Sequence, residues 1–528
     1  MPLTTPAALE GEFDVCVVGA GPAGLACAFD CHDAGLKTLL LEAGGETPVP
    51  GEPDILAADI ADSAWHDPTS ITAAHALGGS THWWGGRSVQ LDPADFRFWP
   101  ITLEEMTPWW AKAAEFLGSC ALSESPPPPA FANLAHFDAV RDECWGPQLN
   151  MGRRWRTRLR SANGPAVLTH ARVTALNIAD GAVASLDVRV GGEMKQVRAR
   201  HIVLTSGGLG ALRLLLLTQR ANPALFGGAQ GPLGRGYMGH LTGSIAALAP
   251  THAADAQAFA CRKIEGGFYA RRRFRPKAET IAREAIVNTA LWLDNAGIGD
   301  PAHGDAAASA KFIAARLARF GAGAGALAPH IANVARAPVS AAAGLSNALY
   351  LLAHARLTGS HPRATHLIPA APGAWRLHYH AEQTRDADNR VSLSDATDSL
   401  GLPKLRIDFR MRDVDFEGVL RAHELLDADL RGAGAGALRF GGDRAEALAD
   451  IAAAARDGYH QLGGAVMSAD PREGVVNTLG RAHDLANLWV AAGAVFPSSG
   501  QANPTLTIVA LARRAAAAIA GRALRAAL

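Results

Sequence analysis

The residues best suited to chemistry lie near the end of the chain, in two turn-forming segments. His460 opens the segment HQLGGAVM, and Asn503 precedes Pro-Thr at the start of an apolar segment with a helical pattern. A neutral imidazole can take the proton of an alcohol, because its pKa lies near the working pH. A side-chain amide can hold the alcohol oxygen as negative charge develops there, because it donates hydrogen bonds without losing its proton. The pair therefore indicates a site that oxidises an alcohol by removing a proton and a hydride.

A hydride needs an acceptor, and the N-terminal segment has the pattern of a dinucleotide-binding fold. Residues 14–18, DVCVV, form a short apolar run typical of a buried strand. The segment GAGPAG follows at 19–24 and leads into a helical pattern, after which a second apolar strand ends at Glu42. Strand, glycine-rich turn, helix, strand and acid are the order that such a fold requires.

The glycines of this turn have separate tasks in a nucleotide site. Gly19 permits the tight turn, Gly21 lets the backbone approach a pyrophosphate, and Gly24 lets the helix pack closely on the strand. The helix that follows presents N–H groups and a partial positive charge to the phosphates. Glu42 is placed to accept hydrogen bonds from ribose hydroxyls, and its charge disfavours a 2′-phosphate. One such motif at the N-terminal end of a long chain favours a tightly held FAD.

A second glycine-rich segment, LGGSTHWWGGRSVQLDPADFRFW, spans residues 77–99. Its four glycines and its adjacent Trp83 and Trp84 suit a backbone that passes close to a planar cofactor between aromatic walls. The alternative is a glycine-rich turn whose two tryptophans belong to the core, since tryptophan is usually buried.

With GAGPAG, this loop and the C-terminal segment together, the chain resembles the glucose-methanol-choline (GMC) flavoprotein oxidoreductases. The resemblance is strongest to the branch of bacterial glycoside 3-dehydrogenases, fructose dehydrogenase large subunits and pyranose 2-oxidases. It implies a Rossmann-like α/β FAD-binding domain plus an α+β substrate domain with an antiparallel sheet, an architecture like that of p-hydroxybenzoate hydroxylase. The expected FAD-binding domain comprises 1–118, 165–245 and 457–528, and the expected substrate domain comprises 119–164 and 246–456, with a helical insertion around 306–357.

The middle of the chain carries the elements expected in the substrate domain. AAASAKFIAARLARF at 306–320 and VSAAAGLSNALYLLAHARL at 339–357 are helical by propensity and apolar spacing. RLHYHAEQ at 376–383, NRVSLS at 389–394 and KLRIDFRM at 404–411 alternate like strands. We expect these three segments to build the antiparallel sheet beneath the substrate pocket.

The resemblance also implies the roles of individual residues. His460 would be the base, Asn503 the donor that positions the oxygen, and FAD the acceptor of hydride at N5. Some pyranose oxidases attach FAD through a histidine in a similar STHW string, but we expect a noncovalent contact at His82. No metal site is expected. The expected FAD contacts are Gly19, Gly21, Pro22, Ala23, Gly24, Glu42, Gly78, Gly79, Ser80, His82, Trp83, Val173, Gly493, Ala494, Asn503, Pro504 and Thr505.

The expected function is the FAD-dependent oxidation of an alcohol to a carbonyl, with a secondary hydroxyl of a sugar or glycoside as the first candidate. Gly464 and Val466 stand where many members have Thr and Arg, so the substrate is less firmly indicated than the catalytic pair. The alternatives are an alcohol on a secondary metabolite, a flavin-containing lyase without net redox, and a noncatalytic nucleotide-binding scaffold. O₂, a quinone or a cytochrome subunit could reoxidise the flavin.

The overall composition is that of a globular protein. Lys+Arg and Asp+Glu both number 50, so no long-range attraction to nucleic acid is expected. No membrane span and no secretory signal are indicated, which predicts a cytoplasmic protein, with export on a partner subunit as the alternative. The six cysteines have no CxxC spacing, and Cys27 and Cys31 are expected to be buried free thiols.

Overall fold

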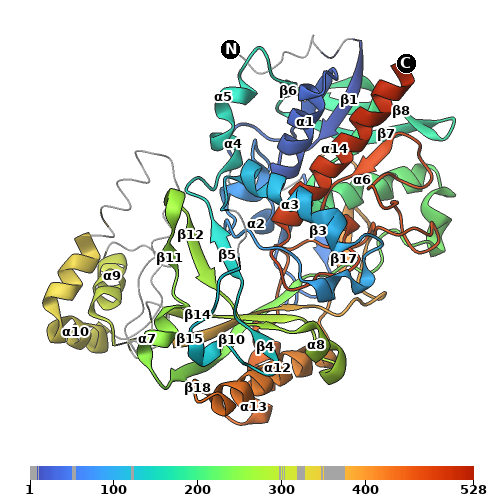
Figure 1. Ribbon diagram of the computed structural model, residues 1–528. Helices are drawn as coiled ribbons and strands as arrows, with labels where there is room; N and C mark the ends of the chain where they lie inside the picture. Colours follow the sequence, from blue (N-terminus) through green and yellow to red (C-terminus); the bar gives the residue numbers. More distant parts are fainter. Residues whose placement is uncertain are drawn as a thin grey trace.

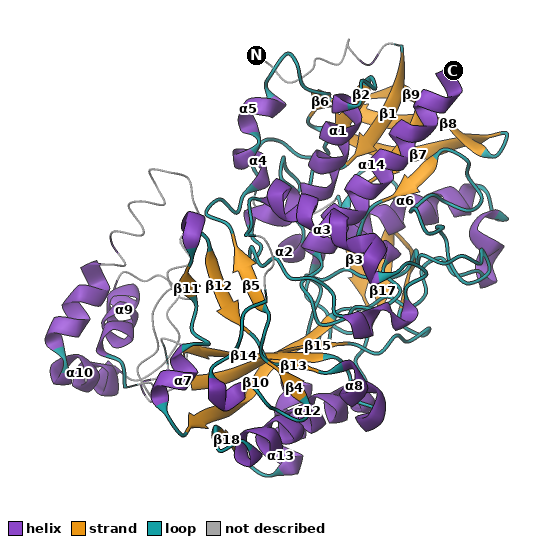
Figure 2. Cartoon of the chain, in the orientation of Figure 1, coloured by secondary structure: helices purple, strands orange, loops and turns teal. Residues whose placement is uncertain are grey.

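The structure, a computed structural model, consists of an α/β unit and an antiparallel sheet unit (Figures 1 and 2). It describes residues 11–49, 55–120, 124–295, 304–317, 327–346 and 375–527, with the single residues 9, 299, 301 and 349. Among the described residues, no helix is long and apolar enough to cross a lipid bilayer.

The α/β unit contains a sheet in the order β6-β2-β1-β9-β8-β7, with β19 also paired to β9. The strands β6, β2, β1, β9 and β19 are parallel, whereas β8 and β7 continue from β9 as antiparallel strands. β2 and the second half of β1, Val15–Val18, are buried, as expected for parallel strands with both faces covered. Their bounds are β1 (Glu12–Val18), β2 (Thr38–Leu41), β6 (Ala166–Leu168), β7 (Ala171–Ala179), β8 (Ala182–Val190), β9 (Glu193–Leu204) and β19 (Leu488–Val490).

The first and last helices of the chain pack side by side in this unit, together with a third (Figure 1). They are α1 (Pro22–Asp33), α14 (Thr505–Ala527) and α3 (Leu103–Leu117), and α6 (Gly207–Ala221) packs against β7. This packing carries the C-terminal segment back to the N-terminal glycine turn. Shorter helices in the same half are α2 (Thr69–Thr72), α4 (Met151–Arg154) and α5 (Arg156–Leu159).

The second unit is built on a four-stranded antiparallel sheet in the order β14-β15-β10-β18. The long helices α12 and α13 lie along this sheet at the bottom of the view in Figure 1. The elements are β10 (His240–Pro250), β14 (Thr289–Asn295), β15 (Trp375–Glu382), β18 (Gly436–Phe440), α12 (Asp413–Gly432) and α13 (Arg444–Ala454). An α/β unit joined to an antiparallel sheet is the architecture that the resemblance predicts.

Three small sheets complete the chain. They contain β11 (Arg262–Lys263), β12 (Tyr269–Arg272) and β5 (Asp142–Trp145), then β13 (Arg275–Pro276) and β4 (Phe137–Asp138), then β16 (Arg390–Thr397), β17 (Pro403–Asp408) and β3 (Ala58–Ile60). The expectation that three alternating segments share one sheet is therefore wrong in part. Only β15 joins the large sheet, whereas the β16–β17 hairpin pairs with β3, because alternation predicts a strand but not its partner.

The structure describes helices within 306–357, where a helical insertion is expected, and the domain assignment itself stays a prediction. α9 (Ala306–Leu317) and α10 (Leu327–Arg336) pack against each other and stand away from the other described elements (Figure 1). Residues 318–326, 347–348 and 350–357 of this segment lie outside the described residues. The remaining helices of this half are α7 (Ala253–Gln257) and α8 (Ala278–Glu284).

The cysteines are used in two ways. Cys27 and Cys31 are buried and free on α1, as the sequence predicts. Cys120 and Cys144 form a disulfide that the sequence did not indicate, since their separation of 24 residues matches no motif. The bridge ties the segment after α3 to β5.

Candidate active site

A cavity of about 570 Å³ lies where the N-terminal glycine turn, the tryptophan loop and the C-terminal segment meet. It brings together residues more than 400 positions apart in the sequence, as the two halves of the expected site require. Of the expected residues, those lining it are Gly19, Gly21, Pro22, Ala23, Glu42, Gly79, Ser80, Trp83, Val173, His460, Gly493, Asn503, Pro504 and Thr505.

Four expected cofactor contacts lie outside this lining: Gly24, Gly78, His82 and Ala494. Gly24 does have the packing role that the sequence also predicts, because a Cβ atom there would lie 1.8 Å from the carbonyl oxygen of Gly19. The imidazole of His82 is turned back on its own loop, where Nε2 lies 3.0 Å from the carbonyl oxygen of Leu77.

The glycine turn has the shape that a dinucleotide phosphate requires. Gly19 has a φ of +104°, and a Cβ atom there would lie 2.7 Å from the Cα atom of Ser206. At Gly21, in contrast, a Cβ atom would meet nothing within 4 Å, so there is open space in front of α1. No side chain caps the N-terminus of α1, and its first N–H groups are left for an anionic ligand. These residues fit the pyrophosphate of FAD.

Glu42 is buried at the end of β2, with 5% of its surface exposed. Its Oε2 atom accepts a hydrogen bond from the Ala20 N–H at 2.8 Å, and its Oε1 atom accepts one from the Gly44 N–H at 2.9 Å. Burial raises the pKa of this carboxyl group to about 7, against the lowering effect of the N–H donors. Each oxygen keeps a further lone pair, so Glu42 can also accept hydrogen bonds from ribose hydroxyls.

The tryptophan loop lies directly against the glycine turn. A Cβ atom at Gly79 would lie 2.9 Å from the Cα atom of Gly21, so the tryptophan loop needs glycine at position 79. Trp83 is 46% exposed and lines the cavity, which excludes it from the core. Trp84 also lines the cavity, and its indole N–H donates to the Leu149 carbonyl oxygen at 2.8 Å. The loop therefore supplies aromatic walls to the cavity.

His460 and Asn503 face each other on the cavity wall. The amide Nδ2 of Asn503 lies 3.4 Å from Nε2 of His460 and donates toward it. Asn503 is held just before α14, while His460 follows a sharp bend at Gly458, whose φ is +147°. The two polar atoms converge on one place, where an alcohol hydroxyl could contact both.

Asp457, which was not predicted from sequence, holds the histidine segment in place. Its Oδ1 atom accepts from the N–H groups of Gly458, Tyr459 and His460 at 2.7, 2.9 and 3.2 Å. Its Oδ2 atom accepts from the His240 N–H at 2.7 Å and lies 3.6 Å from Nδ1 of His460. Burial opposes ionisation, but the two histidines and the N–H donors bring the pKa of Asp457 below its usual value. The acid three residues before His460 was the available signal.

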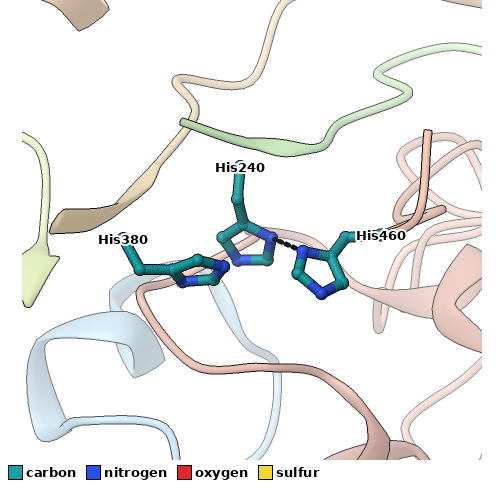
Figure 3. Close-up of side chains that lie close together, drawn as sticks. All are labelled: His240, His380 and His460. Atoms are coloured by element: carbon teal, nitrogen blue, oxygen red, sulfur yellow. Dashed lines mark hydrogen bonds between the residues drawn. The ribbon is translucent and has the colours of Figure 1, made fainter. Parts of the chain in front are cut away.

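Two further histidines complete a cluster with His460 (Figure 3). His240 begins β10 and His380 lies on β15, and their rings stack at 4.2 Å with an interplanar angle of 27°. The ring of His240 lies 4.7 Å from that of His460 at 88°, with a hydrogen bond of 3.0 Å between the two Nδ1 atoms. Neither His240 nor His380 was expected from sequence, because the register of β10 and β15 brings them together.

One ring nitrogen from each of these histidines lies within 4.8 Å of the others, which is close enough for metal ligation to be considered. Lone pairs of imidazole lie in the ring plane, so the stacked rings direct them along nearly parallel planes. Nδ1 of His380 is also engaged, at 2.8 Å from the Gln501 carbonyl oxygen. The geometry favours a hydrogen-bonded cluster.

The cluster is built to stay neutral. Burial lowers the pKa of His240 to about 3, and burial with the neighbouring imidazoles holds the pKa of His380 well below its usual value. Burial also lowers the pKa of His460; Asp457 acts to raise it and Arg87 to lower it further. A neutral His460 has a lone pair available, which is the state that a base requires.

Arg87, the last residue of the WGGR string, also lines the cavity. Its guanidinium lies 4.6 Å from the ring centre of Trp292, and burial lowers its pKa to about 10 while Glu143 opposes this. Arg87 belongs to the loop predicted from sequence, but the sequence did not indicate its role.

Comparisons with known proteins match two segments of the chain that contribute to this cavity. Residues 385–512 match a family model described as GMC oxidoreductase, and residues 14–50 match one described as FAD binding domain. These segments contain His460, Asn503 and the glycine turn.

Among curated proteins, the chain is 24% identical to paromamine 6′-oxidase of Streptomyces fradiae over 96% of this chain and 91% of that protein. It is 23% identical to 2-methyl-1,2-propanediol dehydrogenase of Mycolicibacterium austroafricanum over 96% of this chain and 94% of that protein. Over 25% of this chain and 23% of that protein, it is 35% identical to the fructose dehydrogenase large subunit of Gluconobacter japonicus.

Solved structures show the same fold. A pyridoxine 4-oxidase from Mesorbium loti superposes with a TM-score of 0.52 at 16% identity, covering 96% of this chain and 98% of that one. A fungal aryl-alcohol oxidase superposes with a TM-score of 0.53 at 16% identity, covering 97% of this chain and 99% of that one. The predicted fold class is confirmed.

Proposed function

We propose, from the premise that this chain belongs to the GMC oxidoreductases and binds FAD, that it oxidises a secondary hydroxyl of a sugar or glycoside to a carbonyl. The family match and the relatives both support the oxidation of an alcohol with FAD. The identity of the alcohol is the proposal.

One observation supports the catalytic roles in this proposal. Nε2 of His460 and Nδ2 of Asn503 lie 3.4 Å apart, and both residues line the cavity that the glycine turn also lines. A hydroxyl placed between them would donate its proton to His460 and accept a hydrogen bond from Asn503. His460 then takes the proton, while the amide stabilises the charge that develops on oxygen. Bound FAD would supply the hydride acceptor, held by the N-terminus of α1, Glu42 and the tryptophan loop.

The cavity around this pair suits a substrate with several hydroxyl groups. Thr242, Tyr459 and Arg87, whose side chains can form hydrogen bonds, line the same cavity as His460. Such groups favour the binding of a substrate that can form several hydrogen bonds. Two relatives are named for paromamine and for fructose, which supports a sugar-like substrate.

The test is an anaerobic screen of the FAD-loaded enzyme against neutral sugars, glycosides, aminoglycosides, polyols and aryl alcohols. We expect the flavin absorbance to bleach with a sugar or glycoside, and product analysis to find a carbonyl at a former secondary hydroxyl. Bleaching by aminoglycosides alone would favour the secondary-metabolite alternative. Turnover of an alcohol without any bleaching would contradict the oxidation and favour the lyase.

We propose a dehydrogenase that passes electrons to a separate acceptor, such as a quinone or a cytochrome subunit. Similarity to a protein named as a large subunit supports a partner. A cytoplasmic location was the first expectation, but the Cys120–Cys144 disulfide favours the alternative of an oxidising compartment reached with a partner. Cell fractionation with thiol labelling would decide this: labelling of both cysteines without reductant, in the cytoplasmic fraction, would contradict the export.

A further inference from the structure

The ring of His240 has a different partner at each nitrogen. Its Nε2 atom lies 3.2 Å from the carbonyl oxygen of Ser499, and its Nδ1 atom lies 3.0 Å from Nδ1 of His460 (Figure 3). A carbonyl oxygen can only accept, so Nε2 of His240 must carry a hydrogen. Because burial keeps this ring neutral, its Nδ1 atom has a lone pair and no hydrogen. The hydrogen between the two Nδ1 atoms therefore belongs to His460.

Asp457 leads independently to the same assignment. Its Oδ2 atom lies 3.6 Å from Nδ1 of His460, and a carboxylate favours an N–H group over a lone pair at that position. Two acceptors, the imidazole of His240 and the carboxylate of Asp457, thus face one ring nitrogen. In a neutral His460 ring with its hydrogen on Nδ1, the Nε2 atom carries the lone pair and faces the amide donor of Asn503.

We infer that His240 is a positioning residue that fixes His460 in the tautomer whose Nε2 atom can accept the substrate's proton. The inference rests on the proposed role of His460 as the base. In the reaction, the O–H bond of the alcohol breaks and an N–H bond forms at Nε2 of His460. The Nδ1–H group stays bonded to His240 throughout, so the acceptor that sets the tautomer also stabilises the imidazolium.

One short loop supports all three imidazoles. The carbonyl oxygens of Ser499 and Gln501 contact His240 and His380, and the side chain of Asn503 contacts His460. His380, which stacks on His240, restricts the tilt of that ring. A displacement of this loop would therefore disturb the tautomer and the oxygen-positioning amide together.

Two variants of His240 separate the tautomer from simple packing. Asparagine places a carboxamide where Nδ1 of the imidazole stands, so His240→Asn can still offer an acceptor to His460. Glutamine reaches the position of Nε2, so His240→Gln can still donate to Ser499 but offers His460 no acceptor. We expect kcat in His240→Gln to fall by about 10²- to 10⁴-fold, with KM little changed, because a base in the wrong tautomer cannot take the proton. We expect kcat of His240→Asn to exceed kcat of His240→Gln by at least about tenfold.

The direct readout is the tautomer itself, measured by ¹⁵N spectra of the FAD-loaded protein labelled at histidine. The signals of His460 are assigned as those that vanish in His460→Gln. We expect wild-type His460 to be protonated at Nδ1 only, and His240→Gln to shift it toward the Nε2-protonated form. An Nε2-protonated His460 in the wild type would overturn the inference, as would equal losses in both His240 variants with the tautomer unchanged. Full activity of His460→Gln would instead overturn the proposed function.

Discussion

Replacing Asp457 by asparagine tests how the histidine segment is held. Asparagine can keep the oxygen that accepts the Gly458, Tyr459 and His460 N–H groups. Its NH₂ group then replaces Oδ2 and faces the His240 N–H, which donates to Oδ2 at 2.7 Å in the wild type. Leaving one buried donor without an acceptor costs about 1–3 kcal/mol, so we expect the free energy of unfolding to fall by that amount.

The charge of Asp457 adds two pH effects. The carboxylate raises the pKa of His460, so its loss moves the acid limb of the kcat/KM profile to lower pH. The folded-state pKa of Asp457 lies below 3.8, so the ionised group stabilises the fold at neutral pH. That stability disappears as the pH falls through the folded-state pKa, and the gap between wild type and variant should narrow there. Urea unfolding and pH–rate profiles, run side by side, measure both. Unchanged stability together with an unchanged acid limb would refute the reasoning.

Three further perturbations follow from the contacts around the cavity. In Arg87→Gln, loss of a cation that lowers the pKa of His460 should move the acid limb of kcat/KM to higher pH, and a shift to lower pH would contradict this. Gly24→Ala places a Cβ atom 1.8 Å from a carbonyl oxygen, so its free energy of unfolding should fall by about 1–3 kcal/mol or more. In Gly21→Ala the added Cβ atom has open space, so this variant should fold normally. Its Kd for FAD, measured by titration, should rise by about tenfold or more. Equal unfolding midpoints for the two variants would contradict this assignment. Removing the disulfide in a Cys120→Ser, Cys144→Ser double variant opens a loop of 24 residues and should cost about 3 kcal/mol in urea unfolding, and an unchanged midpoint would argue against the bridge.

Local patterns predicted the parts of the fold that depend on neighbouring residues. The N-terminal elements follow the predicted order of β1, glycine turn, α1, β2 and Glu42. This order was predictable because each of these elements needs a particular residue type in its own segment. The apolar segment after Asn503 is likewise the helix α14.

The parts that depend on distant pairing could not be predicted from one sequence. His240 and His380 meet because β10 and β15 pair in a register that places Thr242 opposite His380. Alternation identifies β15 as a strand, but it carries no information on its partner or register. For the same reason β16 and β17 were placed in the wrong sheet.

His460→Gln tests the central claim most directly. The measurement is the rate of flavin reduction in a single anaerobic turnover with saturating substrate, together with the FAD content of the protein. His483→Gln is the matched control, because His483 lies outside the cavity lining, with Nε2 at 3.1 Å from the Ser468 carbonyl oxygen. We predict a rate lower by at least about 10²-fold in His460→Gln at normal FAD content, with His483→Gln close to wild type. A His460→Gln enzyme that reduces its flavin at a rate near that of the wild type would contradict the account.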